Sequence, residues 1–395
     1  MLASFALIFL CAIALGQICQ KIHIPPLVGM LVTGIILGTL GLIDPSILSA
    51  SANLRTVALV VILLRAGLAI DLRDLKAVGR PAILMCFIPA TCEMIVVTLL
   101  APVLFGVSHI EAAIMGAVLG AVSPAVIVPR MLKLKQEGYG TGKSLPQLIM
   151  AGSSVDDIYL IVLFTMFMGM ERGGGFGAWQ LTAIPISIAT GILAGVLAGF
   201  LLHFVFRRVH MRDTVKLLIT FSAAFLLVAA ENMLKDKLSG VDYFSGLLAV
   251  MALGLTLLKL NPDLASRLSH KFSRVWVAAE IVLFVLVGAA IQFDFSVRQA
   301  LYAVVLIVAA LCVGRFTGVL LCLIRTTFNK RERLFCVIAY IPKATVQAAI
   351  GAIPLTRGVS GGGVILMVAV IAILVTAPLG DILIGATYKK LLTKS

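Results

Sequence analysis

The chain has 395 residues, of which 61% are hydrophobic and 13% are charged, and its mean hydropathy is +1.12. Soluble globular proteins contain about 45–50% apolar and about 25% charged residues, so this composition excludes a soluble enzyme and predicts an integral membrane protein. The net charge of +14 is carried by short loops between apolar runs. That arrangement is typical of membrane topology and not of a surface that binds nucleic acid.

Apolar runs of membrane-spanning length follow one another along the chain, and a spanning helix needs about 20 such residues. They predict an all-α membrane protein with about 13 transmembrane helices. In chain order the predicted spans are residues 2–20, 26–42, 54–70, 80–105, 109–132, 145–170, 181–206, 214–234, 241–259, 273–292, 299–324, 333–355 and 363–388. The first run lacks a basic segment and a small-residue cleavage site, so we interpret it as a retained helix and not as a signal peptide.

Lysine and arginine are distributed unevenly over the predicted loops. Of the 32 in the chain, 23 fall on one side of the membrane, 6 fall on the other, and Arg65, Arg315 and Lys343 lie inside spans. The positive-inside rule then places the N-terminus outside and the C-terminus in the cytoplasm. We expect a multi-pass protein of the bacterial inner membrane.

Weak internal similarity relates the first six helices to the last six. The matching pairs are Gly67 with Gly288 and Ile70 with Ile291 at an offset of 221 residues, and Glu93 with Arg315 and Ser123 with Thr345 at an offset of 222. The two halves are seven helices apart, an odd number, so they have opposite orientations in the membrane. Inverted-topology repeats are typical of secondary transporters, whose binding sites lie near the membrane midplane.

Helix-breaking residues interrupt the fifth and twelfth spans, which occupy corresponding places in the two halves. The fifth span contains Ser123-Pro124 and the twelfth contains Pro342-Lys343. Proline removes a backbone donor and frees carbonyl groups, which at membrane depth are tolerated where they line a site or find new partners. The matched positions favour two discontinuous helices at a binding site over ordinary proline kinks.

Asp156 and Asp157 are adjacent in the middle of the sixth span, where a charge costs several kcal/mol and therefore requires an explanation. Desolvation and mutual repulsion oppose ionisation of both carboxylates, so this pair can exchange a proton near neutral pH. Hard cations such as Na⁺ or Li⁺ prefer oxygen ligands. We expect these aspartates to bind the ion and the proton, with Ser123, Thr345 and freed backbone carbonyls as further ligands. A salt-bridged pair that only holds helices together is the structural alternative.

Four further charged residues within spans require an interpretation. Glu93 and Arg315, at repeat-related positions, are expected to form an ion pair that supports the structure, because a buried charge without its partner is strongly destabilising. Lys343 is interpreted as a fixed positive charge opposite the C-terminal dipole of a half-helix. Glu280 has no evident partner in the sequence, and both a packing role and a gating role stay open for it.

The motifs that carry these residues resemble the sodium/proton antiporters of the NHA type, in the second branch of the monovalent cation/proton antiporter superfamily. They are ILLRAGLAID (62–71), VLGAVSPAVIVPRM (118–131), GSSVDDI (152–158) and YIPKATVQAAIGAIPL (340–355). The resemblance implies that Asp157, with Asp156, binds the ion, that Glu93 and Arg315 form a core salt bridge, and that the broken helices 5 and 12 cross. Relatives with lysine at the position of Arg315 are generally electrogenic, so the arginine favours electroneutral exchange.

The same resemblance implies a homodimer that works by elevator-like alternating access. Its dimerisation-domain helices 1–3 would occupy residues 1–79 and its core-domain helices 4–6 residues 80–180. Residues 181–298 would hold the linker helix 7 and dimerisation-domain helices 8–10, and residues 299–395 the core-domain helices 11–13. The expected partners are a second copy of the chain, membrane lipid, monovalent cations and protons, without nucleic acid and without a cofactor.

The predicted function is antiport of Na⁺ or Li⁺ against H⁺, in which the cation and the proton compete for the aspartate pair. Potassium/proton antiport and cation-coupled symport on the same fold are the alternatives. A channel with the aspartates as a selectivity ring would show flux without proton coupling. An intramembrane aspartyl protease needs two carboxylates that face each other from different helices, and Asp381 is the conceivable second member. We therefore expect a transporter and not an enzyme.

Overall fold

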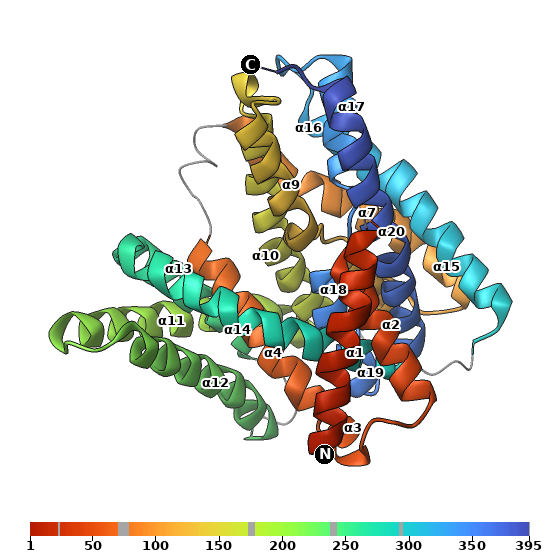
Figure 1. Cartoon of the computed structure of the whole chain (residues 1–395). Coiled ribbons are helices and arrows are strands. Elements are labelled where there is room, and N and C mark those ends of the chain that lie inside the picture. The colour runs from red at the N-terminus through yellow and green to blue at the C-terminus, as the bar shows by residue number, and fades with distance from the viewer. Residues whose placement is uncertain (23, 70–78, 173–177, 238–242, 292–294, 395) are drawn as a thin grey trace. The chain divides into compact units, whose positions relative to one another are not determined.

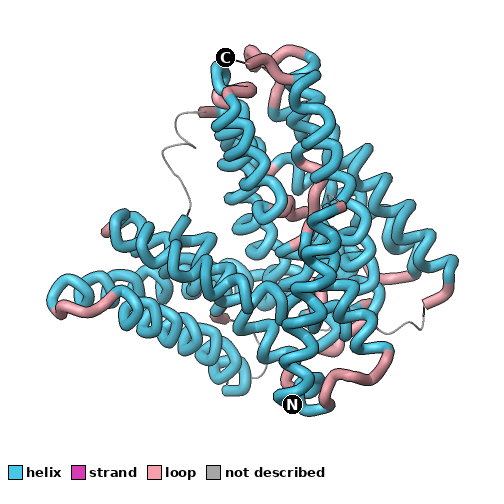
Figure 2. The backbone as a smooth tube through the Cα atoms, in the orientation of Figure 1, coloured by secondary structure: helices cyan, strands magenta, loops and turns pink. Residues whose placement is uncertain are grey.

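The computed structural model describes residues 1–22, 24–69, 79–172, 178–237, 243–291 and 295–394. Within these ranges the chain forms helices and loops and no strand (Figure 2). In chain order (Figure 1) the helices are α1 (Leu2–Lys21), α2 (Pro26–Thr39), α3 (Pro45–Ser49), α4 (Ser51–Ala69), α6 (Arg80–Met85), α7 (Ile88–Phe105), α8 (His109–Leu119), α9 (Pro124–Glu137), η1 (Thr141–Lys143), α10 (Leu145–Arg172), α11 (Ala178–Arg208), α12 (Asp213–Lys237), α13 (Gly246–Leu260), α14 (Pro262–Ala289), α15 (Val297–Ala309), η2 (Ala310–Arg315), α16 (Phe316–Cys322), α17 (Lys330–Ala339), α18 (Thr345–Ile350), α19 (Ile353–Thr356) and α20 (Gly362–Leu391).

The all-helical prediction is confirmed. Ten stretches of the described chain are long and apolar enough to cross a membrane, and shorter apolar helices lie at Pro26–Thr39, Gly246–Leu260 and Thr345–Thr356. Each predicted span coincides with at least one of these helices. The predicted span ends at residues 70, 241 and 292, together with Ile70 of the proposed repeat, lie outside the described residues.

The packing contacts divide the chain into two compact units. Unit 1 comprises Met1–Ala52, Asp71–Leu160 and Leu283–Ser395, and unit 2 comprises Asn53–Ile70 and Ile161–Val282. Inside unit 2, α11, α12 and α13 pack against one another. Gly195 of α11 lies directly on the backbone of Ala249 in α13, where a larger side chain would clash, so small residues set the close approach of these two helices.

Unit 1 contains the broken helices and most of the buried polar side chains. Here α7 packs against α8, η2 and α16, and α20 packs against α8, α15, α17 and α18. Gly314 and Gly318 face α7, and a Cβ atom at either position would lie within 2.6 Å of the Cα atom of Glu93 or Pro89. This small-xxx-small pair lets the backbones meet and places the π-helical turn η2, which contains Gly314, beside Glu93.

Candidate functional site

The first helix break separates α8 from α9 at residues 120–123. A capping box formed by Ser108 and Glu111 starts α8, and Pro124 occupies the first turn of α9, where its missing N–H requires no acceptor. Ser123 precedes that proline with an extended backbone. The sequence therefore ends one helix and starts the next within four residues, in the interior of unit 1.

The second break separates α17 from α18 at residues 340–344. A capping box formed by Asn329 and Glu332 starts α17, and the chain leaves the helix at Tyr340 and Ile341 before Pro342. The ring of Pro342 packs against Gly380 of α20, where any Cβ atom would clash with it. The backbone N–H of Lys343 donates to Thr376 Oγ1 of α20 at 3.0 Å. Helix α20 thus supports the irregular backbone of this break.

The two breaks contact each other directly. The backbone N–H of Ser123 donates a hydrogen bond of 2.9 Å to the carbonyl of Pro342. Both residues belong to the matched proline segments that the sequence predicts to be discontinuous. The predicted breaks in the fifth and twelfth spans are therefore present, and they lie side by side.

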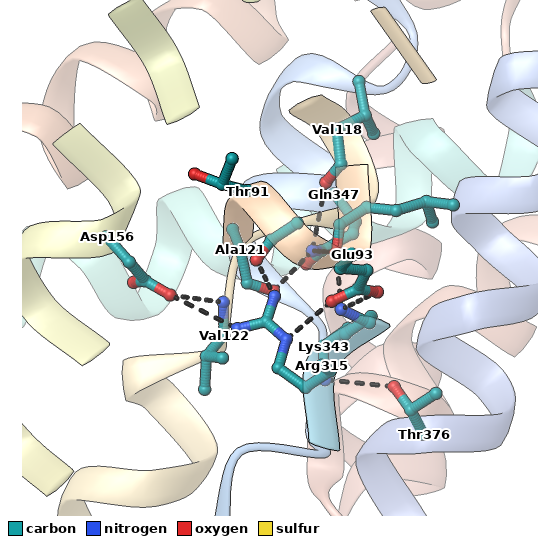
Figure 3. Close-up of polar contacts among 12 residues, drawn as sticks. Thr91, Glu93, Val118, Ala121, Val122, Asp156, Arg315, Lys343, Gln347 and Thr376 are labelled. Carbon is teal, nitrogen blue, oxygen red and sulfur yellow. Dashed lines mark hydrogen bonds and ion pairs between the residues drawn. The ribbon is translucent and has the colours of Figure 1, made fainter. Parts of the chain in front are cut away.

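Three buried charged residues, Glu93, Arg315 and Lys343, form a cluster (Figure 3). Arg315 Nε lies 2.6 Å from one carboxylate oxygen of Glu93, and Lys343 Nζ lies 2.7 Å from the other. The ion pair that the sequence predicted between Glu93 and Arg315 is present, but the cluster also includes Lys343. A single carboxylate thus faces two cations, and this cluster alone carries a surplus positive charge.

The same cations cap the C-terminal end of α8. Arg315 donates to the carbonyl of Gly120, and Lys343 Nζ lies 2.5 Å from the carbonyl of Leu119. Gln347 Nε2 donates to the carbonyls of Val118, Leu119 and Ala121 at 2.8–3.3 Å. The carbonyls of residues 118–121, which the break would leave without partners, are thus all bound by side chains. Side-chain donors thus already bind these four carbonyls, and the expectation that freed backbone carbonyls serve as cation ligands stays a prediction.

Asp156 on α10 points toward this cluster (Figure 3). Its Oδ2 atom accepts a hydrogen bond of 3.3 Å from the backbone N–H of Val122 and lies 3.8 Å from Arg315 Nη1. Asp156 is fully buried and the next residue, Asp157, is 8% exposed. Asp156 therefore contacts the first break from α10 and borders the surplus positive charge around Glu93, and Asp157 follows it in the chain.

Several buried oxygen atoms around the breaks have no hydrogen-bond partner among the described residues. These atoms, here named the open oxygens, are Ser123 Oγ, Asp156 Oδ1, Asp157 Oδ1, Tyr340 Oη, Thr345 Oγ1 and Gln347 Oε1. Most are carboxylate or hydroxyl oxygens, the ligand types that hard cations prefer. Buried polar groups are nearly always satisfied, so six such atoms near two helix breaks indicate a site for a polar species.

The structure gives Asp381 and Glu280 partners that the sequence did not reveal. Two nitrogen atoms of Arg130 on α9 donate to the two carboxylate oxygens of Asp381 on α20, Nε to Oδ1 at 2.5 Å and Nη2 to Oδ2 at 2.6 Å. An aspartate held in this way is a structural anion and not the second carboxylate of a protease. In unit 2, Glu280 interacts electrostatically with Arg65.

Sequence reasoning missed four components of the site. Gln347 and Thr376 were not singled out, because an amide or hydroxyl in an apolar span is more often a packing residue than a cap. Tyr340 was read as part of a motif without a role. The π-helical turn η2 has no local sequence signal, although Gly314 within it marks the close approach to α7.

Comparison with known proteins identifies the fold and the family. The family model described as "Sodium/hydrogen exchanger, transmembrane" matches residues 5–390 of the chain. The chain belongs to the sodium/hydrogen exchanger family. The resemblance to antiporters and the prediction of a transporter instead of an enzyme are therefore confirmed, and the protein is a multi-pass membrane protein.

Relatives within the sodium/hydrogen exchanger family align over almost the whole chain. Sodium/hydrogen exchanger 9B2 of Mus musculus is 31% identical and aligns with 100% of this chain and 74% of its own length. Sodium/hydrogen exchanger 9B1 of Homo sapiens is also 31% identical, over 98% of this chain and 78% of its own. The fold is similar to that of the sodium proton antiporter MjNhaP1 from Methanocaldococcus jannaschii, with a TM-score of 0.83, 19% identity and coverage of 99% and 98% of the two chains.

Proposed function

We propose that this member of the sodium/hydrogen exchanger family is a secondary antiporter that exchanges Na⁺, or Li⁺, for H⁺. The observation that carries the proposal is the buried pair Asp156 and Asp157, each with an open oxygen, beside two helix breaks in contact. Buried carboxylates in a membrane protein mark ion or proton pathways unless they are fully paired. Here each of the two carboxylates has one oxygen without a hydrogen-bond partner among the described residues.

The charge balance supports competition between the proton and the cation. Glu93, Arg315 and Lys343 together carry one surplus positive charge, which an ionised Asp156 balances. A second ionised carboxylate at Asp157 then adds a buried negative charge that is costly unless it is neutralised. Either a bound proton or a bound alkali cation neutralises it, and each excludes the other.

The oxygen ligands of the cation would come from side chains. Asp156 and Asp157 contribute their carboxylates, and Ser123 and Thr345 contribute hydroxyl groups, all with open oxygens. Backbone carbonyls 118–121 would stay with their caps, so the shape of the break would be kept while the cation enters and leaves. Ser123 and Thr345 therefore serve as neutral ligands on either side of the contact between the breaks.

Inverted repeats with crossed discontinuous helices, and about 13 spans in all, are part of the proposal. Ser123 immediately precedes α9, and Thr345, its repeat-related partner, is the first residue of α18. Glu93 and Arg315, the other repeat-related pair, contact each other. The contact between Glu93 and Arg315 supports two inverted halves that form one site.

We further propose an elevator-like mechanism in a homodimer. The site residues Glu93, Ser123, Asp156 and Asp157 fall within residues 80–180, and Arg315, Lys343 and Thr345 fall within residues 299–395, the two segments assigned to the moving core domain. Residues 1–79 and 181–298 would form the linker and the dimerisation domain. The packing units are defined by contacts, whereas these proposed domains are defined by movement during transport. The orientation would be N-terminus outside and C-terminus inside the bacterial inner membrane.

The test is transport by the purified full chain in proteoliposomes that hold a preset pH gradient and a pH-sensitive dye. Added Na⁺ or Li⁺ should collapse the gradient in the parent protein and fail to do so in Asp157→Asn. Asp263→Asn, at an exposed position on α14, is the matched control and should behave as the parent. Collapse by K⁺ alone would instead support potassium/proton exchange, and full activity of Asp157→Asn would contradict the site.

A further inference from the structure

Tyr340 is a fully buried tyrosine at the point where α17 ends and the second break begins. Its hydroxyl is one of the open oxygens, with no hydrogen-bond partner in the part of the chain that the structure describes. The hydroxyl of a buried tyrosine usually finds a partner, because an unsatisfied polar group in the interior costs free energy. The position of this hydroxyl therefore requires an explanation.

The hydroxyl of Tyr340 lies against α10 at Gly152. A Cβ atom at Gly152 would clash with Tyr340 Oη and would lie 3.3 Å from its Cζ atom, so the glycine provides the space for the phenol. Residues four apart share one face of a helix, and Gly152 is four residues before Asp156. The phenol thus reaches the face of α10 that carries Asp156, and the two groups interact electrostatically.

The two groups are chemically complementary. Asp156 accepts a hydrogen bond at Oδ2 from Val122, whereas its Oδ1 is an open oxygen. A phenol is a hydrogen-bond donor, and an ionised carboxylate is a strong acceptor. The phenol donor of Tyr340 therefore lies against α10 at Gly152, and the carboxylate acceptor of Asp156 lies on the same face of α10, about one turn further along. Neither the phenol oxygen nor Asp156 Oδ1 has a hydrogen-bond partner within the described residues.

We propose that Tyr340 is a positioning residue for the ion site: its hydroxyl donates to Asp156 when this carboxylate is ionised and ready to receive the cation. This inference rests on the proposed exchange function. A hydrogen bond to the ionised form opposes protonation of the carboxylate and therefore helps the cation in its competition with the proton. A rotation of one or both side chains would bring the two atoms together when the occupant of the site changes.

Other charged and titratable groups surround the pair, and they stay constant in the test below. They are Glu93 of α7, Asp157 of α10, Arg315 of η2, Lys343 of the second break, Cys86 after α6 and Cys322 of α16. The two cations already favour an ionised Asp156 in every variant. Removal of the Tyr340 hydroxyl therefore changes one hydrogen bond to Asp156, while the charged groups around Asp156 stay the same.

The experiment compares the parent with Tyr340→Phe in proteoliposomes, with Na⁺ varied at several pH values. The variant should show a pH of half-maximal activity about one unit more alkaline and, at neutral pH, an apparent KM for Na⁺ about tenfold higher. The maximal rate at alkaline pH and saturating Na⁺ should equal that of the parent. Tyr302→Phe, which removes a hydroxyl bonded to the exposed Arg298, is the matched control and should change neither quantity.

A second variant approaches the same contact from α10. Gly152→Ala displaces the phenol without altering it, so it should reproduce the alkaline shift, and adding it to Tyr340→Phe should produce little further shift. If the parent exchanges Na⁺ for H⁺ but Tyr340→Phe keeps its KM and pH profile, the inference is overturned while the proposed function stands. A lower rate with unchanged KM and pH profile also overturns it, because that indicates a structural role. If the parent itself exchanges nothing, the proposed function fails first and Asp157→Asn is equally inactive.

Discussion

The backbone N–H of Ser123 donates a hydrogen bond of 2.9 Å to the carbonyl of Pro342, so the break after α8 is tied to the break after α17. The hydroxyl of Ser123 takes no part in this contact and is an open oxygen. The hydroxyl of Thr345 at the start of α18 is also an open oxygen. The joined breaks therefore present two neutral oxygen atoms without using them for their own support.

Removal of either hydroxyl should weaken cation binding and leave the fold intact. Ser123→Ala or Thr345→Ala should raise the apparent KM for Na⁺ by about 3–10-fold, as expected for the loss of one neutral ligand. The backbone contact with Pro342 stays in both variants. Transport kinetics in proteoliposomes provide the measurement, with Ser49→Ala on exposed α3 as control. An unchanged KM in both variants would remove these residues from the ligand set.

The cluster of Glu93, Arg315 and Lys343 should contribute to the stability of the fold. Glu93→Gln leaves two buried cations without their carboxylate, which should lower the free energy of unfolding by about 3–5 kcal/mol. Adding Lys343→Met removes one of those cations, so the double variant should recover part of the loss. Denaturation of the purified variants in detergent measures both effects. A double variant less stable than the single one would show that Lys343 acts independently of Glu93.

The amide of Gln347 is predicted to hold the end of α8. Gln347→Leu leaves the carbonyls of Val118 and Ala121 without the donor that they have now, and each unsatisfied buried carbonyl costs about 1–3 kcal/mol. We expect a lower melting temperature together with lower transport, because the break carries the site. The exposed Gln20→Leu on α1 is the control and should melt as the parent does. Equal melting temperatures for the two variants would argue against the capping role.

The sequence was sufficient for features that depend on local composition or on strong energetic rules. Apolar runs placed the helices because burial in lipid leaves few alternatives, and Pro124 and Pro342 placed the breaks because proline cannot continue the backbone hydrogen bonds. The pairing of Glu93 with Arg315 followed from the cost of lone buried charges.

The rest of the site depends on distances between atoms far apart in the chain. Lys343 was expected to face a helix dipole, but that it also shares Glu93 depends on how η2 and the second break meet at α7. Likewise, whether freed carbonyls bind an ion or a side chain depends on where Gln347 points. Composition and spacing carry no information on either question.

Electroneutral exchange is a prediction from the fixed charge of Arg315. Arginine stays protonated in proteins, so it cannot release a proton that would unbalance a one-for-one exchange. Clamping the membrane potential of the proteoliposomes with valinomycin and equal K⁺ on both sides should leave the initial rate of Na⁺-driven proton flux unchanged. A clear acceleration under the clamp would indicate electrogenic exchange. In that case Lys343 would be the first candidate for a second proton carrier.

Proton release on cation binding tests the central claim most directly. Addition of Na⁺ to the purified protein in weakly buffered detergent solution, near the pH of half-maximal transport, should release about one proton per cation bound, because binding to a protonated carboxylate requires its proton to leave. Asp157→Asn should release none, and Asp263→Asn should release as much as the parent. Saturable Na⁺ binding without proton release in the parent would contradict a site that the two ions share.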